Sequence, residues 1–154
     1  MRDYLLQNDK LPNTMYFSIL YFGNGLEASC RMGAVNIFYY LRSHPRYSFI
    51  PIKIQHLYDA IVGKNDDLIG YCIERVPTIN VTSVQLSIET HNHQFFEYAV
   101  KLFETNPKKV SSTTGIFPIK LYLTTIRDSF NLVALDILYQ YGQLQKIFKL
   151  IQIS

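Results

Sequence analysis

Three stretches of this sequence share one spacing of apolar residues, and this repetition limits the fold more than any other feature. The stretches begin at Leu26, Leu57 and Leu86, and they align on three anchor residues: Gly33, Asn65 and Asn92. The fourth, seventh and eighth positions after each anchor carry Ile37, Tyr40 and Leu41, then Ile69, Cys72 and Ile73, then Phe96, Ala99 and Val100. This spacing marks one face of an amphipathic helix. The sequence therefore predicts a helix after each anchor, with six residues buried between helical units: Ile37, Leu41, Ile69, Ile73, Phe96 and Val100.

The anchor residues suit a tight turn between two antiparallel helices. Such a turn needs a left-handed residue at the end of the first helix, and glycine and asparagine adopt that conformation most readily. Each anchor also follows a small residue by five positions, where a first helix would cross its neighbour closely: Ala28, Ala60 and Ser87. We therefore predict Gly33, Asn65 and Asn92 as structural turns. On this interpretation Asn92→Gly is neutral or slightly stabilising, and Asn92→Val destabilises by about 1–2 kcal/mol.

The tripeptide His91-Asn92-His93 looks more like a reactive site than any other segment. A metal site needs at least one further ligand, and neither His44 nor His56 is spaced to supply it. Nucleases of the HNH type spread their three residues over a hairpin and a helix, so a contiguous tripeptide does not match them. The turn interpretation, with no metal and no cofactor, is therefore favoured. The alternative is a small α/β metal-dependent enzyme or nuclease that uses His91 and His93, and it requires residues 14–22 and 47–54 to be paired strands.

Other catalytic patterns are missing from the sequence. No serine lies in a Gly-x-Ser-x-Gly elbow. Residues 104–118, which we predict to be an exposed loop, lack the glycine pattern of a phosphate-binding loop. The acidic residues, Asp59, Asp66 and Glu74 among them, are interpreted as solvated surface. We therefore predict no catalytic residues and no enzymatic activity.

Composition narrows the function classes further. A chain of 154 residues suits one domain, residues 1–154, and 48% hydrophobic with 18% charged residues indicates a folded chain. The net charge of +3 is mild, and the lysines and arginines are scattered. A nucleic-acid-binding protein would carry a clustered basic stripe, so nucleic acid is not a predicted partner. No run approaches ~18 consecutive apolar residues, so no membrane span is predicted.

Two further features indicate the compartment. Cys30 and Cys72 stand in apolar surroundings, which favours buried thiols in a reducing compartment over a disulfide. The N-terminal segment is interrupted by polar residues and by Pro12, so it lacks the apolar core of a signal peptide. Together these features predict a cytoplasmic location.

The repeat resembles the ankyrin family, whose helical pairs recur near every ~33 residues. The anchors here are 32 and 27 residues apart. In the segment ASCRMGAVNIFYYL, Ser29-Cys30 stand at the place of the family's paired alanines and Gly33 stands on its glycine. Ile79-Asn80 resembles the Val-Asn pair that opens the next ankyrin finger. Residues 134–142, ALDILYQYG, resemble the second ankyrin helix with its closing glycine, Gly142.

The resemblance implies an all-α fold, an ankyrin-like stack of three to four helix-turn-helix units with capping helices at both ends. The approximate units are residues 25–45, 56–78, 83–104 and 119–142, followed by a C-terminal cap at residues 143–154. No unit carries the family's Thr-Pro-Leu-His start. The turn of the last unit falls either at Asp128-Ser129 or at Phe130. Residues 13–24 fit a helix by length and a strand by composition.

A degenerate stack rich in Tyr, Phe and Asn is similar to multigene-family proteins of large cytoplasmic DNA viruses, such as the asfarviruses, and to divergent ankyrin proteins of intracellular bacteria. The resemblance implies a protein-protein interaction module in the host cell cytoplasm. If the viral likeness holds, its partner is a host signalling protein and its role is to modulate innate immune signalling. Arginine and tyrosine are enriched at binding hot spots. The first finger and its surroundings therefore supply the candidate partner-binding residues: Arg42, His44, Arg46, Tyr47 and Tyr58.

Overall fold

The structure, a computed structural model, describes residues 24–111 and 118–145. Most of these residues form four pairs of helices: α3 (Gly25–Arg31) with α4 (Val35–Ser43), α6 (Ile54–Gly63) with α7 (Asp66–Arg75), α8 (Val81–Glu89) with α9 (His93–Thr105), and α10 (Ile119–Ser129) with α11 (Leu132–Gln140). Four short elements complete it: helix α5 (Pro45–Ser48), the 3-10 helix η1 (Pro107–Lys109), and strands β1 (Ile79–Asn80) and β2 (Val110–Ser111), which pair in parallel. The predicted all-α class is confirmed. The question of helix or strand at residues 13–23 lies outside the described residues, as does most of the predicted cap.

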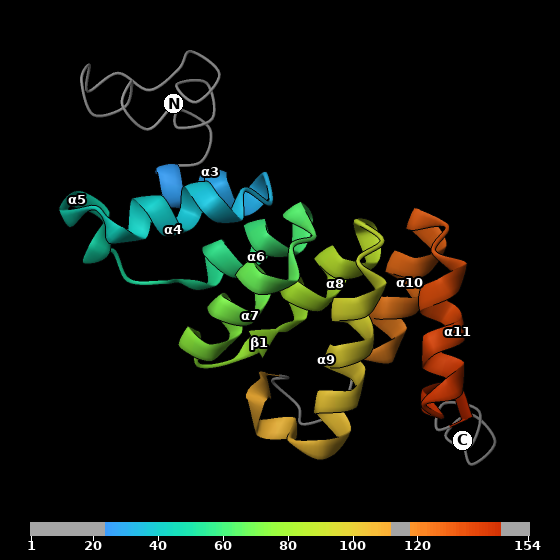
Figure 1. Cartoon of the computed structure of the whole chain (residues 1–154). Coiled ribbons are helices and arrows are strands. Elements are labelled where there is room, and N and C mark those ends of the chain that lie inside the picture. Colours follow the sequence, from blue (N-terminus) through green and yellow to red (C-terminus); the bar gives the residue numbers. More distant parts are fainter. Residues whose placement is uncertain (1–23, 112–117, 146–154) are drawn as a thin grey trace.

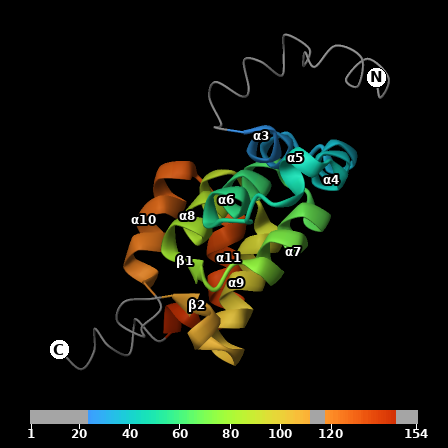
Figure 2. The same cartoon turned by 90° about the vertical axis from the view of Figure 1, so that its left-hand side faces the viewer.

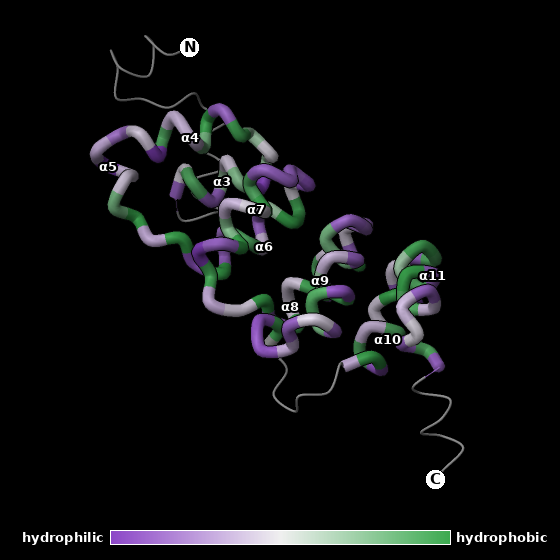
Figure 3. The backbone as a smooth tube through the Cα atoms, turned by 60° about the horizontal axis from the view of Figure 1, so that its bottom comes forward, coloured by the Kyte–Doolittle hydropathy of each residue, from purple (hydrophilic) through white to green (hydrophobic). Residues whose placement is uncertain are grey.

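The four pairs follow one another along the molecule in chain order (Figure 1). The first helices of successive pairs pack directly, α3 on α6, α6 on α8 and α8 on α10. Figure 2, a quarter turn away, separates α6, α8 and α10 from α7, α9 and α11, so the pairs form two layers. Hydrophobic and hydrophilic segments alternate along the helices (Figure 3), as expected for helices that bury one face.

The turn inside each pair contains one left-handed residue, with φ of 62° at Gly33, 53° at Lys64, 55° at His91 and 53° at Phe130. Lys64 and Phe130 directly follow their helices, whereas Met32 and Thr90 stand between the helix and the left-handed residue in the other two turns. In the last three turns the residue after the left-handed one is an asparagine that caps the second helix: Asn65, Asn92 and Asn131. The left-handed conformation was correctly predicted for Gly33 and wrongly for Asn65 and Asn92, which have negative φ. The left-handed residue of the last turn is Phe130, one of the two positions that the sequence left open for this turn.

The asparagines are displaced by one residue from the left-handed position because their side chains cap helices. Asn92 Oδ1 accepts a hydrogen bond from the Phe95 amide at 3.2 Å, and Asn131 Oδ1 accepts one from the Ala134 amide at 3.0 Å. A residue with extended or intermediate backbone geometry can make this N-cap contact, and asparagine is among the best residues for it. The turn therefore uses asparagine for its amide and not for its tolerance of positive φ.

The same asparagines tie each pair to the one before it. Asn92 Nδ2 donates to the Ile61 carbonyl at 3.0 Å, and Asn131 Nδ2 donates to the Ile88 carbonyl at 2.8 Å. Asn65 makes a longer contact of this kind, 3.4 Å from the Gly33 carbonyl. Each accepting carbonyl lies near the end of the preceding pair's first helix. One buried amide therefore satisfies the start of its own helix and the end of a neighbouring one.

We expect Asn92→Ala to lower the free energy of unfolding by about 2–3 kcal/mol, because it removes an N-cap and leaves buried backbone groups unpaired. Asn92→Gly should be similarly destabilising, which replaces the neutral effect predicted from the sequence. Urea denaturation of the variants measures both changes. Asn106→Ala is the matched control, since Asn106 is exposed and makes no side-chain cap contact. Equal stability of Asn92→Ala and Asn106→Ala would contradict the bridging role.

The buried face of each second helix follows the predicted pattern with two exceptions. Leu41, Ile69, Phe96 and Val100 are buried as predicted, whereas Ile37 and Ile73 are only partly buried. In α4 the neighbouring residue Phe38 occupies the core position and is fully buried. The small residues Ala28, Ala60 and Ser87 are buried in the first helices, at the layer where successive pairs pack.

Close backbone contact joins the first two pairs. A side chain added at Gly63 would place its Cβ 2.2 Å from the Cys30 carbonyl oxygen, and one at Gly33 would lie 2.8 Å from the Gly63 carbonyl oxygen. Both glycines are therefore needed for the ends of α3 and α6 to approach. The Cys30 thiol is buried beside Cys72, and its hydrogen bond to Cys72, together with burial, raises its pKa above the usual range. A thiol held protonated in this way is unreactive.

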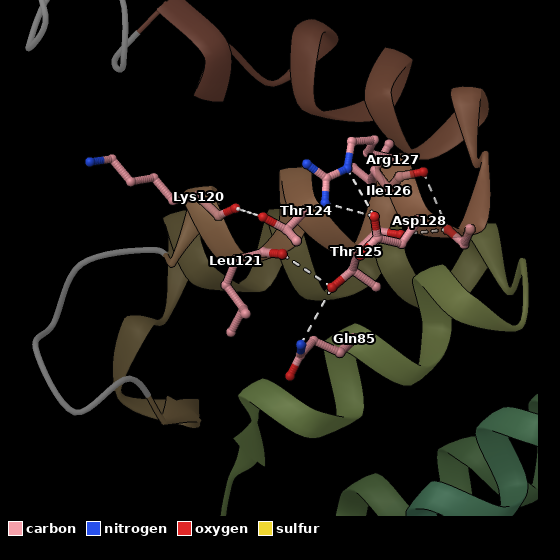
Figure 4. Close-up of polar contacts among 9 residues, drawn as sticks. Gln85, Lys120, Leu121, Thr124, Thr125, Ile126, Arg127 and Asp128 are labelled. Carbon is pink, nitrogen blue, oxygen red and sulfur yellow. Dashed lines mark hydrogen bonds and ion pairs between the residues drawn. The ribbon is translucent and has the colours of Figure 1, made fainter.

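Side-chain contacts add to the Asn131–Ile88 hydrogen bond in joining the last two pairs. Figure 4 shows Gln85 of α8 reaching Thr125 of α10, where Nε2 donates to Oγ1 at 3.4 Å. Thr125 Oγ1 in turn donates to the Leu121 carbonyl at 3.1 Å within α10. The rings of Phe96 and Tyr122 meet edge to face 6.5 Å apart, which joins α9 to α10. Polar and aromatic side-chain contacts therefore both connect these two pairs.

Candidate functional site: a groove between α7 and α9

A groove of about 440 Å³ lies between the second helices α7 and α9. Its volume falls within the range typical of ligand sites. Four apolar or aromatic residues form its floor and walls: Ile69, Ile73, Phe95 and Tyr98. Phe95 is nearly buried, while Tyr98 is exposed, and their rings lie 6.3 Å apart in a tilted arrangement. The partial exposure of Ile73, unexpected from the helical pattern, follows from its place in this groove.

Gly70 keeps the groove open. It lies in the middle of α7, and a Cβ added there would meet no atom within 4 Å. A glycine inside a helix costs about 1 kcal/mol relative to alanine, so packing in the described residues does not account for it. The missing side chain instead leaves open space on the face that lines the groove. A ligand that approaches α7 closely would need this space.

The rim of the groove is acidic. Asp66 and Glu74 contribute carboxylates, Gln94 adds an amide, and none of the eight lining residues is a lysine, arginine or histidine. Glu74 Oε2 accepts from Arg75 Nη1 at 3.0 Å, but both side chains are exposed, and such surface pairs contribute little. Asp66 sits in the first turn of α7, where the helix dipole favours a carboxylate.

The predicted partner-binding residues do not line this groove. Arg42 is half-buried and its guanidinium is engaged within the protein. Its Nη1 donates to the carbonyls of Tyr47 at 3.1 Å and Ile50 at 2.8 Å, and its Nε donates to Tyr71 Oη at 3.2 Å. It fixes the segment after α4 against α7. Tyr58 is half-buried, and its hydroxyl accepts a hydrogen bond from Asn80 Nδ2.

The other three predicted residues belong to α5 and its cap. His44 Nδ1 accepts from the Arg46 amide at 3.2 Å and caps α5, and the His44 and Tyr47 rings lie 6.2 Å apart. Tyr47 is half-buried, whereas His44 and Arg46 are exposed. A role in partner binding for these five residues stays a prediction, with exposed side chains only at His44 and Arg46.

The two histidines stand on either side of Asn92 in the third turn. His91 is exposed and has the left-handed conformation. His93 is the first residue of α9, and its Nε2 lies 3.0 Å from Asn131 Oδ1, to which it donates in the tautomer with a proton on Nε2. Their rings are 5.7 Å apart. Within residues 24–111 and 118–145, no group of three His, Cys, Asp or Glu residues could hold a metal ion. Residues 47–54, required as a strand by the enzyme alternative, contain part of α5 and the start of α6 instead; residues 14–22 lie outside the described residues.

The histidines should tolerate alanine. His91→Ala and His93→Ala are each expected to change the free energy of unfolding by about 1 kcal/mol or less, because one side chain is exposed and the other loses one hydrogen bond. A chelator should leave the melting temperature of the wild-type protein unchanged. A bound ion stabilises only the folded state, so a lower melting temperature with chelator would favour the metal alternative.

Two buried ionisable groups lie in α6, away from the groove. Asp59, predicted as solvated surface, is only 1% exposed, and burial raises its pKa although Gln55 and Arg31 each donate to it at 3.3 Å. The prediction failed because Arg31 of the preceding pair reaches this carboxylate across the α3–α6 contact. His56 is also buried, and its Nδ1 accepts from the Lys53 amide at 3.1 Å. Its Nε2 has no hydrogen-bond partner among the described residues.

Acidification should destabilise the protein through His56. Burial, with the charges of Lys53 and Arg42, lowers the pKa of His56, so the unfolded state takes up the proton first. The stability that neutral His56 contributes is present above its unfolded pKa, near 6.5, and is lost as the pH falls, at no more than about 1.4 kcal/mol per pH unit. His56→Gln keeps an acceptor and removes the titration. The free energy of unfolding of the wild type, relative to that of the variant, should therefore decrease from pH 7 to pH 5. A relative stability that does not change with pH would contradict the assignment.

Two further findings bear on this candidate site. No helix in the described ranges is long and apolar enough to cross a membrane. Comparisons with protein-family models, with curated proteins and with solved structures found no match to this chain.

Proposed function

We propose that this chain is a non-enzymatic protein-protein interaction module, built as an ankyrin-like stack, which binds its partner in the groove between α7 and α9. The observation that carries the proposal is Gly70, a helix-interior glycine that packs against nothing in the part of the chain that the structure describes and lies in an apolar groove with a charged rim. An open groove of this kind suits a segment of another protein, whose side chains fill it while its backbone runs along the surface.

Three features support the ankyrin-like part of the proposal. Four helical pairs succeed one another along the chain, and their first helices pack in one layer. The first three pairs carry small residues at that layer, including Ala28 and Ala60. Each pair turns at a left-handed residue, which in the first pair is a glycine at the position the family resemblance assigns. Stacks of helical pairs bind partners through extended surfaces and need no catalytic residues.

The resemblance to viral multigene-family proteins extends the proposal to the biological setting. On that basis the partner is a host signalling protein, the location is the host cell cytoplasm, and the outcome of binding is altered innate immune signalling. This part of the proposal rests on the degenerate repeats and on the Tyr, Phe and Asn content of the sequence. Identification of the partner tests it.

Photo-crosslinking from inside the groove tests the proposed site. Tyr98 is replaced by benzoylphenylalanine, which preserves an aromatic ring at an exposed groove position. Thr124, exposed on α10 and outside the groove, carries the same group in the control protein. Irradiation in cells should yield protein adducts from position 98 that position 124 does not form, and mass spectrometry identifies the captured protein. Adducts of the same identity and yield from both positions, or none from position 98, would refute the proposal.

A further inference from the structure

The acidic rim and Gly70 share one ridge of α7. Asp66, Gly70 and Glu74 are spaced at i, i+4 and i+8, so they lie one above another along the helix. A rise of 1.5 Å per residue separates the two carboxylate positions by about 12 Å. The ridge therefore presents a negative charge, an opening and a second negative charge. The opening leads to the apolar floor formed by Ile69, Ile73 and Phe95.

An extended peptide has a matching repeat. Its side chains at i, i+2 and i+4 point to the same side, and a rise of about 3.3 Å per residue places the first and last of them about 13 Å apart. Resting on the proposed function, we infer that the groove selects an extended segment with the pattern basic-x-apolar-x-basic. The apolar side chain enters the opening at Gly70, and the two Lys or Arg side chains pair with Asp66 and Glu74.

The charges around the ridge are compatible with this pattern. Two cations of the protein lie near the C-terminal end of α7, and both are engaged. Arg75 stacks over the Tyr71 ring at 3.6 Å and pairs with Glu74, while Lys109 Nζ donates to the carbonyls of Ile73 and Val76 at 3.2 and 2.8 Å. An incoming cation at Glu74 also meets the negative end of the helix dipole. An acidic segment would instead face like charge at both ends of the groove.

Titration of the full-length, ¹⁵N-labelled protein with synthetic peptides tests the inference. The probe is acetyl-Ser-Arg-Ser-Leu-Ser-Arg-Ser-amide. Its comparison peptides carry Glu for both Arg, Ser for Leu, or the two Arg directly beside Leu. The probe should shift the amide signals of Gly70, Ile73 and Phe95 saturably. Each comparison peptide should bind at least about tenfold more weakly than the probe.

A protein variant provides the second arm. The double variant Asp66→Asn/Glu74→Gln should weaken probe binding about tenfold, and Asp136→Asn, an exposed carboxylate on α11, should leave it unchanged. Equal binding of the acidic peptide, shifts confined to residues outside the groove, or no saturable shift at millimolar peptide would overturn the inference. If position 98 still crosslinks a protein in that case, the charge pattern is wrong and the proposed function stands. If it does not, both fail.

Discussion

Phe96→Ala is expected to lower the free energy of unfolding by about 3–5 kcal/mol, the cost of deleting a large buried aromatic side chain. Phe96 is fully buried in α9 and packs edge to face on Tyr122 of α10, so its loss opens a cavity between two pairs. Because each pair in a stack is supported by its neighbours, the change should lower the stability of the whole domain. Thermal and urea denaturation measure it.

Phe49→Ala is the matched control. Phe49 is 87% exposed, so the same deletion there should change stability by about 0.5 kcal/mol or less. If the Phe96→Ala protein melts within a degree or two of the Phe49→Ala protein, Phe96 is not a core residue and the packing of α9 on α10 is wrong.

Gly63→Ala should destabilise by about 3 kcal/mol or more, the upper range for overpacking. The new methyl group would lie 2.2 Å from the Cys30 carbonyl oxygen and 3.0 Å from the Arg31 carbonyl oxygen. Both are backbone atoms that cannot rotate away, so relief requires α3 and α6 to separate. Unfolding of the variant in urea gives the change, and loss of protection at α3 amides in hydrogen exchange locates it.

The same substitution at Gly70, Gly70→Ala, is expected to raise the free energy of unfolding. Its methyl group meets nothing within 4 Å, and alanine is the better helix former, so the variant should gain about 1 kcal/mol. The two alanine variants together test the packing of the first two pairs. A Gly63→Ala protein as stable as Gly70→Ala would show that α3 and α6 do not approach as described.

The all-α class could be predicted from the sequence because helix faces repeat with a fixed period. The turns were harder. Gly33 was correctly predicted as left-handed, because glycine signals that conformation directly. Lys64, His91 and Phe130 carry no such signal, and the asparagine after each of them is equally suited to a left-handed turn and to an N-cap. Only the packing of successive pairs, which brings carbonyls such as that of Ile61 within reach of the amide, decides between these roles.

The groove could not be predicted because it lies between helices of different pairs. The sequence pattern gives the buried face of one helix but not the distance between α7 and α9, so Tyr98 and Glu74 read as ordinary surface. Gly70 was the available signal, a glycine within a helical pattern. Composition instead pointed to Arg42 and Tyr58, whose polar groups are engaged by residues distant in sequence, Tyr71 and Asn80 respectively.

Gly70→Leu gives the most direct test of the groove as the partner-binding site. The leucine should fill the opening between α7 and α9 without harming the helix, while Thr124→Leu adds the same side chain at an exposed site on α10. Calorimetry with the purified protein captured from position 98 measures the affinity of both variants. We expect Gly70→Leu to bind at least about tenfold more weakly than wild type at an undiminished melting temperature, and Thr124→Leu to bind as wild type. Wild-type affinity in the Gly70→Leu protein would contradict the assignment of the groove.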